Sequence, residues 1–441
     1  MKTFTKEDVL EKAAENNVKF IRLQFTNIFG TLKNIAITVE ELERALEGQI
    51  SFDSSVIEGT VDRHESDILL NPDPSTFVIF PWRPREGAVA RLICDVLNPD
   101  GTPFAGCSRS VLKRNLAEAE NKGLHLQVGA EIEFFLFQTD ESGKPTVITH
   151  DQAGYCDLTP VDMGENARRD MVLTLQEMGF DVSSSHHEIA PGQHEIFLKD
   201  DDALAMADSI TTFKFVVRTI AQRHGLHATF MPKPVSDVNG SGMHLQISLW
   251  RNDQNVFFDQ TKPNGLSAIA NRFIAGLVEH AGALTAVANP LVNSYKRISA
   301  NDLAPVLAGW SENNRSAMIR VPSWRGAGTR VVLRSPDPSG NPYLVVSAAL
   351  QAGLDGIERG LHPPAPLKED IPAWEIKNVI REKGLPRSLE HALKAFKQDE
   401  VIWRALGESI SSRFLRVKEQ EWERFQSKVH RWEIDEYLRN Y

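Results

Sequence analysis

The sequence predicts an α+β protein whose 441 residues form two domains, residues 1–103 and residues 104–441. Three observations lead to this prediction. Strand-like segments mix with two short helical segments in the first hundred residues. The stretch 98–106, NPDGTPFAG, is dense in residues that interrupt regular structure, so we place the domain boundary there. Beyond it, helices that stop at glycines alternate with apolar strands, which is typical of an open sheet backed by helices.

In the first domain, Thr5 and Asp8 form a capping box that predicts a helix to about residue 16. Residues 52–59 show no periodicity, so we expect an irregular segment there. The other expected elements are strands at 18–25, 31–38, 76–80 and 88–97 and a helix at 40–47. This domain should therefore contain about four strands and two helices.

In the second domain, helices are expected at 110–122, 165–178, 203–224 and 267–288. The first three are followed by glycines and the fourth by an Asn-Pro pair, which are common helix stops. The chain after residue 363 is mostly helical, with a helix start at Ser388 and a long charged helix over about 401–429.

The segment from Val128 to Phe137 reads as an apolar strand that carries two carboxylates. Alternate strand residues share a face, so Glu131 and Glu133 point the same way, and Ile132 points into the core with Phe134. Two like charges on one face repel unless a cation lies between them. A solvated face is the usual explanation for such a pair.

Two further stretches favour a binding site instead. Residues 183–197, SSSHHEIAPGQHEIF, contain the turn signal Pro191-Gly192, and a hairpin closed about this pair places Glu188 opposite Glu195 and His187 opposite Ile196.

Residues 239–250 begin rich in glycine and continue as a strand with His244, Gln246, Ser248 and Trp250 on one face. Four glutamates and one histidine, with no cysteine nearby, suit Mg²⁺ or Mn²⁺ better than structural zinc.

Six arginines follow within a short stretch that contains few acids: Arg297, Arg315, Arg320, Arg325, Arg330 and Arg334. The planar guanidinium binds carboxylate and phosphate oxygens at two points. Ordinary surface ion pairs would explain any one of these arginines, but six arginines together favour an anion-binding site. Arginines opposite a metal-binding acidic face indicate phosphoryl transfer or an acyl-phosphate intermediate. The sequence has no Walker lysine loop.

Composition excludes several functional classes. The net charge is -10, and no Lys/Arg block marks a nucleic-acid partner. Cys94, Cys107 and Cys156 fit neither a disulfide framework nor a C-x-x-C metal site, which favours a reducing compartment. The N-terminus is not a signal peptide and no apolar stretch approaches a membrane span, so we expect a cytoplasmic protein without a membrane partner.

Several long motifs, in order, resemble the type I glutamine synthetases in their short Gram-positive form: IRLQFTNIFGTLKN, TFVIFPW, NPDGTPF, SHHEIAPGQHEI, FMPKP, VNGSGMH, NPLVNSYKR, NRSAMIRVP and DPSGNPYL. The resemblance covers nearly the whole chain. It implies an N-terminal β-grasp domain, a catalytic domain with a curved antiparallel sheet, and a dodecamer of two hexameric rings with sites between subunits. It also implies that ATP converts glutamate to γ-glutamyl phosphate, which an amine then attacks.

The resemblance assigns roles to individual residues. One Mg²⁺ or Mn²⁺ would be held by Glu133, Glu188 and Glu195, and a second by Glu131 and His244. Glutamate would bind to Asn239, Gly240, Arg297 and Arg334. The transferring phosphoryl group would contact Arg315 and Arg320, and the nucleotide would contact Ser248 and Arg330. The ammonium ion would be bound and deprotonated by Asp53 of a neighbouring subunit and by Tyr155.

Three positions depart from the family pattern. Leu303 stands where the family has a flap glutamate, Val332 replaces a carboxylate at the second metal, and Phe52-Asp-Ser-Ser-Val56 replaces F-D-G-S-S. These changes make the ammonium pocket more apolar, which predicts a larger primary amine as the nucleophile. The alternatives are an ammonia-using glutamine synthetase and a catalytically silent homologue with a regulatory or scaffold role.

Overall fold

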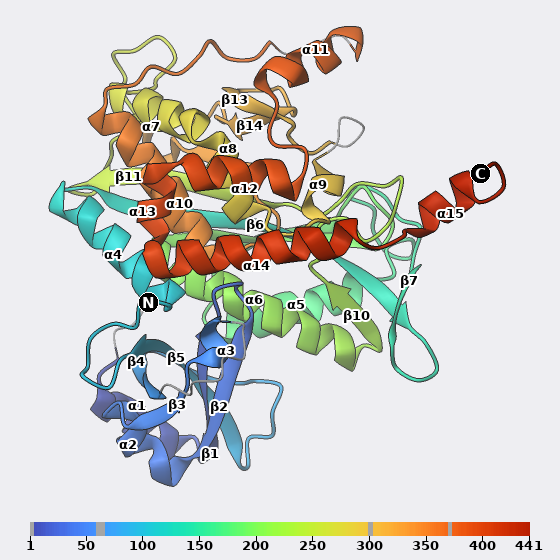
Figure 1. The fold of residues 1–441 in the computed structure, drawn as a ribbon. Helices are drawn as coiled ribbons and strands as arrows, with labels where there is room; N and C mark the ends of the chain where they lie inside the picture. Colours follow the sequence, from blue (N-terminus) through green and yellow to red (C-terminus); the bar gives the residue numbers. More distant parts are fainter. Residues whose placement is uncertain (1–3, 59–66, 299–302, 369–372) are drawn as a thin grey trace.

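The computed structural model describes residues 4–58, 67–298, 303–368 and 373–441. Its N-terminal part is a five-stranded sheet in the order β2-β1-β5-β4-β3, with two helices against it (Figure 1). The elements are α1 (Lys6–Glu15), β1 (Val18–Thr26), β2 (Leu32–Thr38), the 3-10 turn η1 (Val39–Glu41), α2 (Leu42–Leu46), β3 (Ile50–Asp53), α3 (Ser55–Glu58), β4 (Asp67–Ile79) and β5 (Ala88–Leu97). The predicted capping box at Thr5 and Asp8 is confirmed at the start of α1.

Two expectations for this domain are wrong. The segment predicted to be irregular contains the end of β3 and the helical turn α3. Strand β4 begins at Asp67 instead of residue 76, and its additional N-terminal half pairs with β3, the fifth strand of the sheet. Pro72 and Pro74 hide the strand in the sequence because proline cannot donate to the ladder. The sheet accommodates this stretch with a shift in the β4–β5 register between Asp73 and Val78.

The larger part of the chain is built on a curved ten-stranded sheet, ordered β13-β14-β15-β11-β6-β9-β8, with β10, β12 and β7 paired beside this path. Its central strands are antiparallel. The strands are β6 (His125–Thr139), β7 (Pro145–Thr149), β8 (Val182–His187), β9 (Gln193–Asp202), β10 (Leu226–Thr229), β11 (Met243–Arg251), β12 (Gln254–Asn255), β13 (Leu307–Ser311), β14 (Ala317–Arg320) and β15 (Val331–Leu333).

Helices back this sheet, as predicted (Figure 1). The almost completely buried helix α10 packs against α4, α6, α7, α8 and α13. The helices are α4 (Ser108–Asn121), α5 (Glu165–Glu177), α6 (Ala203–Arg223), α7 (Ala268–Glu279), α8 (Ala281–Ala288), α9 (Ser294–Arg297), α10 (Pro342–Glu358), α11 (Ala373–Lys383), α12 (Leu389–Gln398), α13 (Glu400–Leu406), α14 (Glu408–Gln426) and α15 (Arg431–Tyr437), with a 3-10 turn η2 (Gly326–Gly328). The predicted start at Ser388 is confirmed as the N-cap of α12.

Two predicted long helices are interrupted. The helix expected over 267–288 divides at His280, whose ring contacts Asp399 at 2.7 Å and Asp355 at 3.0 Å. The helix expected over 401–429 divides at Gly407, whose φ of +84° is incompatible with a right-handed helix. Tertiary contacts and one glycine therefore override the amphipathic periodicity at these two places.

A buried ion network joins the two parts of the chain. Arg109 of α4 contacts Asp73 at 2.7 Å and Asp95 at 2.9 Å in the N-terminal sheet. Its Nε and Nη2 atoms also donate to Asp208 of α6 at 2.9 Å each. Arg109 is 3% exposed, so the network is shielded from water.

None of the helices within the described ranges combines the length and apolarity needed to cross a bilayer.

Candidate active site

Three adjacent strands bring the predicted acidic residues together. In the register of β6 with β11, Glu131 lies opposite His244, and in the register of β6 with β9, Glu133 lies opposite Glu195. Ile132 is fully buried on the other face, as the alternation predicts.

Polar contacts fix the two glutamates of β6. Glu131 contacts His244 Nδ1 at 2.9 Å and accepts from Gln246 Nε2 at 2.5 Å. Glu133 accepts from the backbone N–H of Gly242 at 2.8 Å and from Gln193 Nε2 at 3.0 Å. The remaining lone pairs of these carboxylates are free to bind a cation.

The predicted hairpin exists, but its predicted register is wrong. Glu195 pairs with His186 instead of Glu188, and His187 pairs with His194 instead of Ile196. The connection is a five-residue loop, residues 188–192, because the backbone N–H of Glu188 donates to Gln193. The Pro-Gly signal marks this loop but does not fix its length.

This register places an imidazole between two carboxylates. His186 Nε2 lies 3.0 Å from Glu188 Oε1 and 3.1 Å from Glu195 Oε2. The hydrogen bonds to Glu188 and Glu195 raise the pKa of His186 to about 10. Burial, together with the charge of Glu133, raises the pKa of Glu195 to about 7. One imidazolium therefore serves two carboxylates, and Glu195 still carries a raised pKa, as expected where a further cation would be stabilised.

The donor set fits a hard divalent cation. Two groups of potential ligands share Glu195: one adds Glu131 and His244, and the other adds His186 and Glu188. Most of these ligand atoms are carboxylate oxygens, which Mg²⁺ and Mn²⁺ prefer.

These groups open into a cavity of about 650 Å³, the acidic cavity. Five arginines form another part of its wall: Arg297, Arg315, Arg320, Arg330 and Arg334. Burial and the neighbouring arginines lower the pKa of Arg334 to about 10, so this wall would gain from a bound anion. Arg325 lies outside the lining and pairs with Glu312 at 2.9 Å.

The glycine-rich loop before β11 supplies a close backbone approach. Asn239 and Gly240 line the acidic cavity. A Cβ atom at Gly240 would lie 2.2 Å from the carbonyl oxygen of Pro232, so only glycine fits.

The other predicted site residues fall into two groups. Tyr155, Leu303 and Val332 line the acidic cavity, and the Tyr155 ring meets that of His186 edge-on at 5.3 Å. Two residues lie outside it. Ser248 is 5% exposed and accepts from Trp250 Nε1. Asp53 lies on β3, where its carboxylate accepts from the backbone and hydroxyl of Ser55.

Sequence reasoning missed two polar residues at the site, His186 and Gln193, and also the contact of Gln246 with Glu131. His186 precedes Glu188 by two residues, and this spacing could have suggested a shared strand face. Gln193 carried no such signal, since its contact with Glu133 depends on the length of the hairpin loop.

Two models of a known protein family match this chain. Residues 17–99 match the family model "Glutamine synthetase, beta-Grasp domain", and residues 105–437 match "Glutamine synthetase, catalytic domain". The chain is 54% identical over 444 residues to a glutamine synthetase of Clostridium saccharobutylicum, with full coverage of both chains. It is 51% identical over 445 residues to that of Staphylococcus aureus N315, covering 100% of this chain and 99% of the relative.

Solved structures agree with these matches. The fold matches a GmaS/ADP complex with a TM-score of 0.89 and 34% identity, covering 98% of this chain and 99% of that one. It also matches the glutamine synthetase of Plasmodium falciparum, with a TM-score of 0.87 and 26% identity, covering 99% of each chain. The chain therefore belongs to the type I glutamine synthetase family of ATP-dependent ligases.

Proposed function

We propose that this chain uses ATP to activate glutamate as γ-glutamyl phosphate and transfers the γ-glutamyl group to a primary amine larger than ammonia. The observation that carries the choice of amine is Leu303. Its side chain is 44% exposed and lines the acidic cavity, where the family resemblance predicts a flap glutamate.

The two walls of the acidic cavity support the ligase chemistry. A divalent cation held by the glutamates and His244 would neutralise the phosphate oxygens. Glutamate would be bound through Arg297, Arg334, Asn239 and the backbone of Gly240. Arg315 and Arg320 would stabilise the transferring phosphoryl group, and Arg330 would contact the nucleotide. The buried Ser248 would take part in nucleotide binding through β11 instead of direct contact.

The amine end of the cavity supports the choice of nucleophile. Ammonium needs carboxylates to hold and deprotonate it, because moving a bare cation out of water costs several kcal/mol. Leu303, Ala304 and Ile189 instead offer apolar surface in the lining. Each buried methylene of an alkylamine would gain about 0.8 kcal/mol, or roughly fourfold in affinity.

Two alternatives have specific support. The identity of 54% to a glutamine synthetase over the full length favours ammonia as the substrate. Val332, where the family pattern has a metal-binding carboxylate, favours a silent homologue with a regulatory or scaffold role.

The position of Asp53 has a consequence for how subunits would assemble. It lies in the N-terminal sheet and not in the lining of this chain's own cavity. Its proposed role in amine deprotonation therefore requires a neighbouring subunit, as in a dodecamer of two hexameric rings.

The test is phosphate release from ATP with glutamate and Mg²⁺ or Mn²⁺, run with ammonium, with a series of primary amines and without acceptor. Release stimulated by an alkylamine but not by ammonium is expected. Release with ammonium alone would replace this proposal by an ammonia-using synthetase. No release from folded, assembled protein would leave the silent homologue.

Two variants at one position sharpen the result. Leu303→Glu restores the flap carboxylate and should shift the preference toward ammonium. Leu303→Gln has the same length without charge and should weaken alkylamine use without gaining ammonium use. Equal effects of both variants would show that loss of leucine, and not the missing charge, determines the preference.

A further inference from the structure

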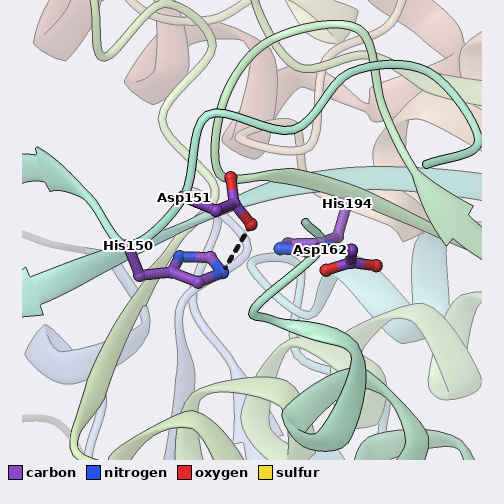
Figure 2. A group of neighbouring side chains, drawn as sticks. All are labelled: His150, Asp151, Asp162 and His194. Atoms are coloured by element: carbon purple, nitrogen blue, oxygen red, sulfur yellow. Dashed lines mark ion pairs between the residues drawn. The ribbon is translucent and has the colours of Figure 1, made fainter. Parts of the chain in front are cut away.

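A second group of titratable side chains lies apart from the acidic cavity. It comprises His150, Asp151, Asp162 and His194, shown in Figure 2 and called here the His–Asp cluster. His194 directly precedes Glu195 on β9, and successive strand side chains point to opposite faces. The cluster therefore lies on the other face of the sheet. Its members are at most 9% exposed, and none of them lines the acidic cavity.

The inward-facing atoms of the cluster lack hydrogen bonds. They are His150 Nε2, Asp151 Oδ2, Asp162 Oδ2 and His194 Nε2, all buried. His150 Nε2 and Asp151 Oδ2 lie 3.0 Å apart, as Figure 2 marks, but not in the alignment of a hydrogen bond. Buried polar atoms in native proteins nearly always have a partner. His194 Nε2 has no hydrogen-bond partner, and Asp162 Oδ2 has only its ion pair with Arg168, so these buried atoms point to a common ligand.

The outward-facing atoms are already fixed by the backbone. His150 Nδ1 lies 3.1 Å from the carbonyl oxygen of Leu136, which sets the proton on Nδ1 and leaves the Nε2 lone pair free. Asp151 Oδ1 accepts from the N–H of Gly192 at 2.8 Å, and Asp162 Oδ1 accepts from the N–H of Gly164 at 3.0 Å. Second contacts of this kind are what orient side chains that bind metals.

We propose that the His–Asp cluster is a buried site for one divalent transition-metal ion, with Zn²⁺ the best match. Zn²⁺ binds histidine nitrogen and aspartate oxygen, and two of each would complete the four-coordinate, tetrahedral shell that is usual for a closed zinc site. One atom from each of the four residues lies within 4.8 Å of the others. Ligand atoms around Zn²⁺ are about 3.4 Å apart, so the side chains must close inward slightly on binding.

Gly164 provides the space for the ion. A Cβ atom there would lie 2.6 Å from His150 Nε2 and 2.6 Å from His194 Nε2. A point close to both nitrogens is therefore free only because this residue is glycine.

Arg168 is the competing cation. Its Nη1 lies 2.7 Å from Asp162 Oδ2 and 2.8 Å from His194 Nδ1. A guanidinium only donates, so its bond to Nδ1 places the ring proton on Nε2 of His194. Metal binding through Nε2 needs the opposite tautomer. The ion and the Arg168–His194 contact therefore exclude each other, and Arg168 must keep only its contact with Asp162 when metal binds.

The bound ion would stabilise the loop that carries Glu188. Asp151 Oδ1 contacts His187 Nε2 at 3.2 Å and the N–H of Gly192 at 2.8 Å. His187 directly precedes that loop, and Gly192 is its last residue. This structural role is separate from catalysis, so the test does not use activity.

The full-length chain, stripped with a chelator, is titrated with Co²⁺ at saturating Mg²⁺, and the d–d absorption is recorded. The strong bands of tetrahedral Co²⁺ are expected at one ion per chain, and Zn²⁺ should abolish them. His150→Asn should lose the bands. The matched control is His224→Asn, which removes a histidine paired with Asp170 at 2.9 Å on the surface and should retain them.

A second variant tests the competition in the opposite direction. In Arg168→Gln the amide oxygen can accept from Nδ1–H of His194, and the positive charge is gone. Co²⁺ should then bind about tenfold more tightly or better. The proposal is overturned if wild-type protein shows no tetrahedral bands. It is also overturned if His150→Asn keeps them, or if folded Arg168→Gln protein gains no affinity.

Discussion

His186 lies directly across the β8–β9 hairpin from Glu195, with 3.1 Å between its Nε2 atom and Glu195 Oε2. The same nitrogen lies 3.0 Å from Glu188 Oε1. The imidazolium therefore lies between two carboxylates and offsets the repulsion between them. It does so at the place where the proposed function requires a divalent cation.

We expect His186→Gln to lower the free energy of unfolding by about 1.5–3 kcal/mol without divalent cation, the usual contribution of hydrogen bonds to charged groups. Saturating Mg²⁺ should reduce this loss, because the ion takes over the neutralising charge. Urea unfolding at both Mg²⁺ levels measures the difference. His125→Gln, which removes an exposed histidine 3.7 Å from Asp202 at the start of β6, is the control. An equal loss with and without Mg²⁺ would contradict the electrostatic explanation.

Val332 provides a test of whether the proposed second metal site is weakened. It lies opposite Gln246 in the β11–β15 register, and Gln246 donates to Glu131. A carboxylate at this position would extend the acidic wall of the cavity. Val332→Glu should lower the Mg²⁺ concentration needed for half-saturation by about tenfold, the smaller end of what a supporting group contributes to metal affinity.

Isothermal titration with Mg²⁺ checks this expectation, and Val332→Gln controls for polarity without charge. If Val332→Glu binds Mg²⁺ no better than Val332→Gln, the position does not reach the metal, and the silent-homologue alternative loses its support.

The sequence predicts local structure where one residue type decides it. The period of two in β6 identifies the shared face of Glu131 and Glu133, and Ser388 correctly marks the start of a helix. Prediction from the sequence fails where the local structure depends on residues that are distant along the chain. The hairpin register follows from a loop length that Pro191-Gly192 does not specify. His280 divides a helix because of contacts with two later segments.

The acidic cavity and the His–Asp cluster also differ in how far the sequence predicts them. Most residues of the acidic cavity are recognisable because they lie in long motifs with a family resemblance. The His–Asp cluster has no such signal, since its four members come from a loop, a turn and a strand without characteristic spacing. Only the fold brings these side chains together.

The ion network of Arg109 should be essential to the joint between the two sheets. Removing the guanidinium takes away the counterion that Asp73, Asp95 and the buried Asp208 share. Breaking a buried pair in this way costs about 3–5 kcal/mol. Arg109→Met, which keeps the apolar volume, should lower the free energy of unfolding by that amount in chemical denaturation.

Lys113→Ala is the matched control. Lys113 contacts Asp95, but its side chain is 39% exposed, so its loss should cost about 1 kcal/mol or less. Similar losses for Arg109→Met and Lys113→Ala would show that the network does not depend on the buried guanidinium.

His280 gives the expected dependence of stability on pH. Burial alone would lower its pKa, but the hydrogen bonds that its ring donates to Asp399 and Asp355 outweigh burial, and the pKa is raised above its usual 6.5. Arg359, 2.8 Å from Asp355, is the remaining charge at this junction. A histidine with a raised folded-state pKa contributes stability that is complete below about pH 6.5 and is lost as the pH rises through the folded-state pKa. The free energy of unfolding should therefore fall above pH 6.5, with a contribution from this residue of no more than about 1.4 kcal/mol per pH unit, the limit for one proton.

Urea unfolding of wild type and His280→Asn across this range isolates the contribution, since the variant should be less stable at pH 6 and approach wild type at alkaline pH. A stability difference that stays constant with pH would mean that His280 acts through packing between α7 and α8 and not through its charge.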